Sequence, residues 1–124
     1  MRALALRPGC KGLVSDACVP ISALAENIAA AQADLVEKAL IGTILGHVGD
    51  GNFHVVLMTD PEDTAEAEKV SAFLKGITQR AQDAGGTCTG EHGIGQGKMA
   101  ALAAEAGASL DVMRAIKLAL DPRQ

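Results

Sequence analysis

A β-hairpin is indicated most clearly by the stretch Gly46-His47-Val48-Gly49-Asp50-Gly51-Asn52-Phe53-His54. Its Asp50-Gly51 pair favours a tight type I′ turn, because both central residues of that turn need a positive φ. A turn centred there places His47 directly opposite His54 on one face of the hairpin, with Cβ atoms about 5 Å apart. The sequence therefore predicts two imidazoles that are close enough to hold one metal ion.

Strands and helices alternate around this hairpin. Apolar residues at helical spacing predict two amphipathic helices, and Asp60 and Pro61 are residue types that cap and begin the second of them. Along the chain we expect a strand at 12–19, a helix at 21–38, strands at 41–47 and 52–59, a helix from 60 to 83, a strand at 86–89, and helices at 98–105 and 109–120. This β-α-β-β-α-β order predicts an α+β, ferredoxin-like split βαβ fold, in which an antiparallel sheet has helices on one face and a helical C-terminal tail follows.

Composition and charge narrow the class of protein. The 124 residues suffice for one domain with its own core, and the 48% hydrophobic but only 2% aromatic content means that alanine and aliphatic side chains must fill that core. The formal net charge of −4 argues against nucleic acid or an anionic membrane as the main partner. No apolar run approaches the roughly 20 residues of a membrane-spanning helix. Three widely spaced cysteines, an odd number, predict reduced thiols in an intracellular protein.

Glu91 and His92 follow the last predicted strand. In a split βαβ sheet the first and third strands are central and the fourth pairs with the first, so Glu91 reaches the histidine pair only if the sheet curls or the loop crosses over. If it does, His47, His54 and Glu91 form a set that suits a catalytic Zn²⁺ with one open position, and Mn²⁺ or Fe²⁺ is also compatible. His92 would then be free to act as an acid or base.

Each of these residues also has a simpler interpretation. Cross-strand histidines occur without a metal, and a glutamate after a strand is commonly a solvated loop carboxylate. Asn52 either orients a ligand or stabilises the turn. Gly90 opens a glycine-rich segment, which is typical of a tight loop whose backbone approaches something closely.

Two separated stretches resemble the signature motifs of the C-terminal domain of FAD-linked oxidases. They are residues 47–54, quoted above, and Gly85-Gly86-Thr87-Cys88-Thr89-Gly90-Glu91-His92-Gly93-Ile94-Gly95. Residues 16–22 (Asp-Ala-Cys-Val-Pro-Ile-Ser) and 113–122 are similar to the same family. The group that the chain resembles most is that of D-lactate dehydrogenase (cytochrome) and the glycolate oxidase D-subunit, in the vanillyl-alcohol oxidase superfamily.

The resemblance implies the C-terminal portion of an FAD-dependent D-2-hydroxy-acid dehydrogenase, which oxidises D-lactate or glycolate to the 2-oxo acid. His47, His54 and Glu91 would hold a divalent metal, Zn or Mn, and His92 would take the proton of the substrate hydroxyl. Asn52 and Gly90 would lie near the substrate or cofactor. FAD would be bound mainly by an N-terminal domain that residues 1–124 do not contain, so the isolated chain should be inactive.

On this comparison residues 1–124 correspond to the substrate, or cap, domain of these enzymes, truncated at both ends. The expected partners are a small 2-hydroxy acid and the FAD-binding domain of the same enzyme. Loss of that domain would expose apolar surface and favour a homodimer. We expect a cytoplasmic location, or a peripheral membrane association through an electron-acceptor partner. The alternative hypothesis is a stand-alone, non-catalytic metal- or ligand-binding module.

Overall fold

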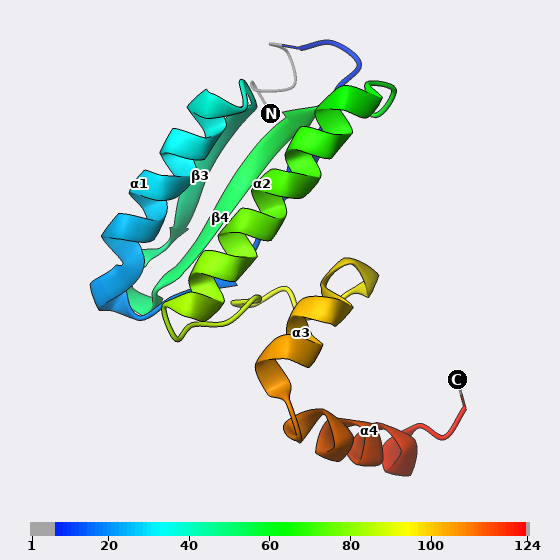
Figure 1. Cartoon of the computed structure of the whole chain (residues 1–124). Coiled ribbons are helices and arrows are strands. Elements are labelled where there is room, and N and C mark those ends of the chain that lie inside the picture. Colours follow the sequence, from blue (N-terminus) through cyan, green and yellow to red (C-terminus); the bar gives the residue numbers. More distant parts are fainter. Residues whose placement is uncertain (1–6, 124) are drawn as a thin grey trace. The chain divides into compact units, whose positions relative to one another are not determined.

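Strand β4 (Asn52–Thr59) is the centre of an antiparallel sheet in the computed structural model, which describes residues 7–123 (Figure 1). Its partner on one side is β3 (Ile41–His47), the other arm of the hairpin. The bounds of both strands match the predicted ranges. The hairpin that the sequence indicates most clearly is therefore the middle of the sheet.

The other edge of β4 pairs with a strand that is broken in the middle. Its two parts, β1 (Lys11–Val14) and β2 (Ala17–Cys18), keep one register along β4, so no residue is inserted at the break. The strand that we predicted at 86–89 is reduced to a single bridge between Thr87 and Cys18. The order β3, β4, β1 with β2, then Thr87 is that of a split βαβ sheet, and the predicted α+β fold class is confirmed.

The predicted strand at 12–19 is interrupted because Ser15 uses its side chain where a continuous strand would use its backbone. The backbone N–H of Val55 donates to Ser15 Oγ (2.8 Å), and the Ser15 carbonyl lies 3.2 Å from His54 Nδ1. The Ser15 N–H still donates to the Val55 carbonyl (2.9 Å), which keeps the register. The break thus places a backbone acceptor beside a buried imidazole.

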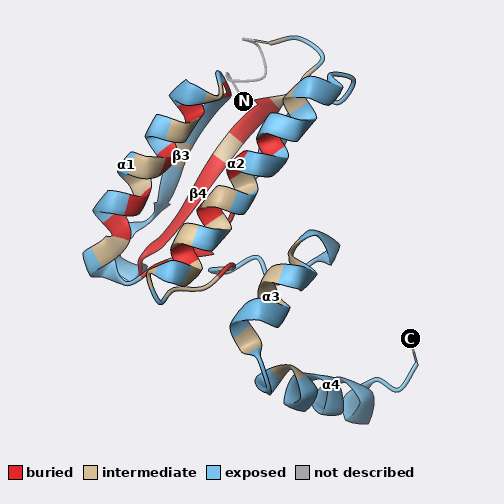
Figure 2. Ribbon diagram, in the orientation of Figure 1, coloured by how far each residue is buried: buried red, intermediate tan, exposed pale blue. Residues whose placement is uncertain are grey.

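Helices α1 (Ile21–Glu37) and α2 (Thr64–Asp83) lie side by side over one face of the sheet (Figures 1 and 2). Side chains alternate along β4, and Phe53, Val55 and Leu57, on the face toward the helices, are fully buried. The main core residues are Phe53, Val55, Leu57, Leu24, Ala31, Leu35, Val70, Phe73, Ile77 and Ala81. The core is therefore aliphatic and rich in alanine apart from two phenylalanines, as the composition predicts. The three cysteines are free thiols, which was also predicted.

Helix α2 begins later than predicted. Its N-cap is Asp63, whose side chain accepts a hydrogen bond from the Glu66 N–H (3.0 Å), so the assignment of the cap to Asp60 and of the first helical position to Pro61 was wrong. Asp63 and Glu66 have the three-residue spacing of a capping box, and the helix begins after Asp63 and not after Asp60. A hydrogen bond from Arg7 (2.6 Å), followed by one from the Asp60 N–H, lowers the pKa of Glu66. Glu66 is therefore ionised at neutral pH and anchors the start of α2.

The turn of the hairpin is longer than predicted. A 3₁₀ turn, η2 (Val48–Asp50), precedes Gly51, and Gly51 is the residue of this turn with a positive φ, 74°. His47 consequently pairs with Asn52, and the predicted direct pairing with His54 was wrong. The difference amounts to two residues, and side chains alternate with a period of two. His47 and His54 therefore still share one face of the sheet, as diagonal neighbours.

Residues 94–124 form a separate unit that contains η3 (Gln96–Lys98), α3 (Met99–Ala106) and α4 (Ser109–Leu120). Both helices were predicted, and their bounds agree with the predicted ranges to within one residue. Their side chains are exposed or half-buried wherever the structure describes them (Figure 2). Across residues 7–123, no helix is long and apolar enough to cross a membrane.

Candidate metal centre

His54 lies at the centre of a cluster of ionisable side chains on the face of the sheet opposite the helices. The ring is almost fully buried, with its Nδ1 atom 3.2 Å from the Ser15 carbonyl oxygen and 3.4 Å from Asp16 Oδ1. Its other nitrogen, Nε2, lies 3.0 Å from Glu91 Oε1. A carbonyl oxygen can only accept, so Nδ1 carries the proton in this arrangement. A His54 ring that carries this one proton presents the electron pair of Nε2 to Glu91.

Three imidazoles converge on Glu91 Oε1. Besides His54 Nε2, His47 Nδ1 and His92 Nε2 each lie 3.6 Å from this oxygen. The candidate ligand atoms of His47, His54 and Glu91 all lie within 4.8 Å of one another. In a tetrahedral zinc site with bonds of about 2.0–2.1 Å, nitrogen and oxygen ligands are about 3.3 Å apart, and the observed distances lie on either side of that value. The three side chains thus fit a divalent cation.

A positive charge is needed between these groups. A carboxylate oxygen and the unprotonated nitrogen of a neutral imidazole both present electron pairs, so at 3.0 Å they repel unless a proton or a cation lies between them. A divalent metal would satisfy all of them at once, whereas a single proton would satisfy one nitrogen. The donor set of two imidazoles and one carboxylate is also one that Zn²⁺ or Mn²⁺ accepts.

The cluster is anchored on its buried side and open on the other. The His54 side chain is 5% exposed, whereas those of His47, Glu91 and His92 are between 45% and 64% exposed. Structural zinc sites are closed by four protein ligands, and catalytic sites keep a position for water or substrate. Three candidate ligands and an open side therefore match the catalytic type.

Glu91 reaches the histidines because its loop is held by Asp16. One carboxylate oxygen, Oδ2, accepts hydrogen bonds from the backbone N–H groups of Gly90 (2.8 Å), His92 (3.1 Å) and Glu91 (3.2 Å). The hydroxyl of Thr89 donates to the same oxygen (2.7 Å). Burial raises the pKa of Asp16, but these hydrogen bonds, with that of Thr89 the strongest, outweigh it and lower the pKa. Asp16 is therefore a buried carboxylate.

Asp16 was missed when the site was predicted from the sequence. A signal was present, because Ser15 and Asp16 are two polar residues in the middle of an otherwise apolar strand. Both are buried, with relative exposures of 5% and 4%. A buried carboxylate needs specific partners, and in this protein the partners are a loop far along the chain and the imidazole of His54.

Asn52 and Gly90 are in direct contact. A Cβ atom on Gly90 would lie 2.2 Å from Asn52 Oδ1, so the close approach expected of the glycine-rich loop is to this buried amide. Asn52 is also the residue that pairs with His47 across the hairpin. Both residues thus pack next to residues of the cluster and support their positions. Their proximity to a substrate or cofactor stays a prediction.

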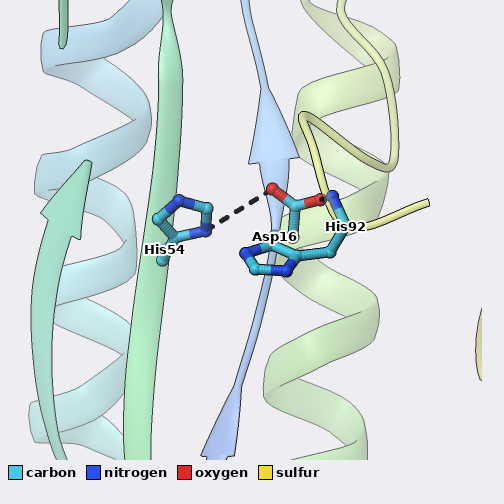
Figure 3. A group of neighbouring side chains, drawn as sticks. All are labelled: Asp16, His54 and His92. Carbon is cyan, nitrogen blue, oxygen red and sulfur yellow. Dashed lines mark hydrogen bonds and ion pairs between the residues drawn. The ribbon is translucent and has the colours of Figure 1, made fainter. Parts of the chain in front are cut away.

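A second set of side chains overlaps the first. Asp16, His54 and His92 also present candidate ligand atoms within 4.8 Å of one another, and Figure 3 shows the His54 ring directed from β4 toward the Asp16 carboxylate. The rings of His54 and His92 meet edge to face, with centroids 5.2 Å apart. Asp16 is engaged by four donors on its other oxygen, and this set faces the buried side. The set that contains Glu91 is therefore the better candidate for a site that admits substrate.

Comparison with known proteins agrees with these features. The model of the family described as "FAD linked oxidases, C-terminal domain" matches residues 1–124. The chain is 51% identical over 122 residues to a probable mitochondrial D-lactate dehydrogenase of Danio rerio, with 98% of this chain and 24% of the relative covered. It is 43% identical to the mitochondrial D-lactate dehydrogenase (cytochrome) of Arabidopsis thaliana, with 95% and 21% covered. It is 39% identical to the glycolate oxidase subunit GlcD of Bacillus subtilis, with 90% and 24% covered.

The chain spans about a quarter of the length of these relatives. Its match to the family model, in contrast, extends from the first residue to the last. The two motifs identified in the sequence, around His54 and around Glu91, lie in the matched region and meet in space. The chain belongs to the family of C-terminal domains of FAD-linked oxidases.

Proposed function

We propose that this chain supplies the metal site and the proton acceptor of an FAD-dependent D-2-hydroxy-acid dehydrogenase that acts on D-lactate or glycolate. The observation that carries the proposal is the convergence of the His47, His54 and Glu91 ligand atoms within 4.8 Å, on the open side of a buried anchor. The names of the relatives, D-lactate dehydrogenase and glycolate oxidase subunit, support the substrate class.

In this function His47, His54 and Glu91 would hold a divalent metal and so orient the substrate that binds to it. A bound divalent metal would act as a Lewis acid on the substrate hydroxyl, and the flavin of the complete enzyme would accept the hydride. His92 Nε2 lies 3.6 Å from Glu91 Oε1, and this closeness to a proposed metal ligand supports its role as the acceptor of the hydroxyl proton. Loss of that proton and of one hydride converts the 2-hydroxy acid to the 2-oxo acid.

Metal and ligand titration of the 124-residue chain tests this function. After chelator treatment we expect one Zn²⁺ or Mn²⁺ per chain by calorimetry and elemental analysis. With Co²⁺ as a visible probe, D-lactate should change the absorption spectrum, because its hydroxyl and carboxylate are adjacent and can chelate the metal. The control ligand 3-hydroxypropionate, whose hydroxyl is one carbon farther away, should change it much less. A folded chain that binds no metal above background would contradict the proposal.

A stand-alone binding module without catalysis is the second candidate. The observation in its favour is that the complete donor set lies within this one chain. The two candidates make different predictions for His92. In the complete enzyme, His92→Gln should retain the metal and lower kcat by about 100-fold or more, as expected for loss of a general base. A binding module has no kcat that this substitution could lower.

The open face of the sheet is the surface that we assign to the FAD-binding domain of the same enzyme. Its exposed apolar side chains include Val14 (55%), Ile41 (51%) and Leu45 (52%), and such patches favour association.

In the isolated chain we expect the same face of the sheet to pair two copies into a homodimer. Sedimentation velocity should show a mass that rises with concentration. Leu45→Thr should reduce the association, and Val36→Thr, on α1, should not. A monomer at all concentrations would contradict this assignment.

Our predicted location is the cytoplasm, with peripheral membrane contact through an electron acceptor as the alternative. The relatives from Danio rerio and Arabidopsis thaliana are described as mitochondrial, so a mitochondrial location is a further candidate. Fractionation of cells that express the complete protein distinguishes the three.

A further inference from the structure

Asp16 contacts both His54 and the loop that carries Glu91, two parts of the candidate metal centre. Its Oδ1 atom faces His54 Nδ1 at 3.4 Å, and its Oδ2 atom accepts the hydrogen bonds that hold the loop of Glu91. We propose that Asp16 is a positioning residue: one oxygen fixes the tautomer of His54, and the other fixes the distance between Glu91 and His54. The second part rests on the proposed metal function, whereas the first concerns the metal-free chain.

The tautomer follows from what surrounds His54 Nδ1. The Ser15 carbonyl at 3.2 Å and the Asp16 carboxylate at 3.4 Å are both acceptors, so both favour a proton on Nδ1. Glu91 Oε1, 3.0 Å from Nε2, is also an acceptor, but its side chain is 45% exposed and can turn toward water, whereas the Ser15 carbonyl and the Asp16 carboxylate are buried and fixed. The opposite tautomer, with a bare Nδ1 between two buried acceptors, is therefore the costlier one. Nε2 is thereby left with its electron pair, and this is the atom that faces Glu91. Such a partner behind a histidine ligand sets the direction and basicity of the ligand atom.

The position of the loop follows from the other oxygen. Asp16 lies in the break between β1 and β2, and the continuous register of those strands places it across from His54. The loop that follows Thr87 lies on the far side of this broken strand. Three successive N–H groups, of Gly90, Glu91 and His92, point at one carboxylate oxygen, and this brings the loop back across the strand. Without that anion the three donors would lose their common acceptor, and Glu91 would lose its fixed distance from His54.

The tautomer can be measured directly because the chain contains only three histidines. Long-range ¹H–¹⁵N NMR spectra of ¹⁵N-histidine-labelled, metal-free protein at mildly alkaline pH should show His54 with its proton on Nδ1. In Asp16→Asn, the amide group that replaces Oδ1 is a donor toward Nδ1, and the spectrum should shift toward the other tautomer. His54 with its proton on Nε2 in the wild-type chain would overturn the proposal. This readout does not depend on whether any metal binds.

Metal affinity tests the second half. Asp16→Asn should weaken Zn²⁺ binding by about 10- to 100-fold, the range typical of residues that support a ligand. Asp34→Asn is the matched control, because Asp34 is a partly buried carboxylate paired with Arg80 (2.7 Å) outside the cluster, and it should leave the affinity unchanged. Equal affinities of wild type and Asp16→Asn would overturn this half of the proposal.

Two further measurements keep the test decisive. If Asp16→Asn does not fold, Thr89→Val removes one donor to Oδ2 and spares the contact with His54, so it should weaken Zn²⁺ binding while the His54 tautomer stays unchanged. In the zinc-loaded wild type, the ¹⁵N shifts show which His54 nitrogen binds the ion: Nε2 supports a positioning role, and Nδ1 would make Asp16 a ligand and overturn it. If no metal binds but Nδ1 is protonated, the proposed metal function fails and the tautomer assignment stands.

Discussion

Stoichiometric zinc binding is lost when His54 is replaced by glutamine: we expect the dissociation constant to rise by more than about 100-fold, beyond the range for residues that only support a ligand. His54 is the buried member of the cluster, and its Nε2 atom has the shortest distance to Glu91 Oε1, 3.0 Å. Its direction is fixed by the Ser15 carbonyl behind it. The His47 side chain is 64% exposed, and an exposed ligand is held less firmly, so its replacement should have the smaller effect. Calorimetric titration with Zn²⁺ measures both variants.

His92→Gln is the control for this prediction. His92 is adjacent to Glu91 and its ring meets that of His54, so it resembles a ligand in position and chemistry. As a proton acceptor rather than a ligand, it should leave the zinc affinity within a few-fold of the wild type. A circular dichroism melt should show that His54→Gln is folded at the titration temperature. Unchanged stoichiometry in folded His54→Gln, or an equal loss in His92→Gln, would contradict the assignment of ligands.

Local sequence signals predicted the elements of the fold well. Strands β3 and β4 were predicted with their observed bounds, because two short runs rich in apolar and β-branched residues flank the turn signal Asp50-Gly51. The turn itself was predicted wrongly, since a longer loop with one positive φ replaced the two-residue turn. The pair of histidines survived this error only because the change in register was an even number of residues.

The convergence of Glu91 with the histidines depends on a contact that the sequence pattern does not display. The fourth strand of the predicted topology lies beyond the first, and the hydrogen bonds from its loop to Asp16 bring Glu91 across. Asp16 is 75 residues away from Glu91 along the chain. Periodicity and turn chemistry report on neighbours in sequence, whereas a buried carboxylate takes its partners from wherever the fold brings them. The resemblance to FAD-linked oxidases indicated Glu91 as a metal ligand, but it did not explain what brings Glu91 close to the histidines.

Gly51→Ala should be the most destabilising single-methyl change in the hairpin, with a loss of about 2–5 kcal/mol in the free energy of unfolding. Gly51 has a φ of 74°, which costs an L-residue roughly 1–2 kcal/mol. Its added Cβ would also lie 2.0 Å from the Val19 carbonyl oxygen, which belongs to the backbone and cannot rotate away. The Val19 N–H donates to the Gly51 carbonyl (3.0 Å), so relieving the clash breaks this bond as well.

Gly49→Ala is the matched control, because it adds the same methyl group to the same loop. Gly49 has open space where the Cβ would lie and is not among the glycines with positive φ, so the variant should be as stable as the wild type or slightly more so. Urea unfolding measures both. The expected loss is a large part of the roughly 5–15 kcal/mol by which typical domains are stable. Gly51→Ala should also weaken zinc binding, because relieving the clash moves the end of β3, which carries His47. His54→Gln, in contrast, should lose the metal with a smaller loss of stability. Equal unfolding curves for the two alanine variants would contradict the role of Gly51, because the added methyl group meets a positive φ and a backbone clash at Gly51 and neither at Gly49.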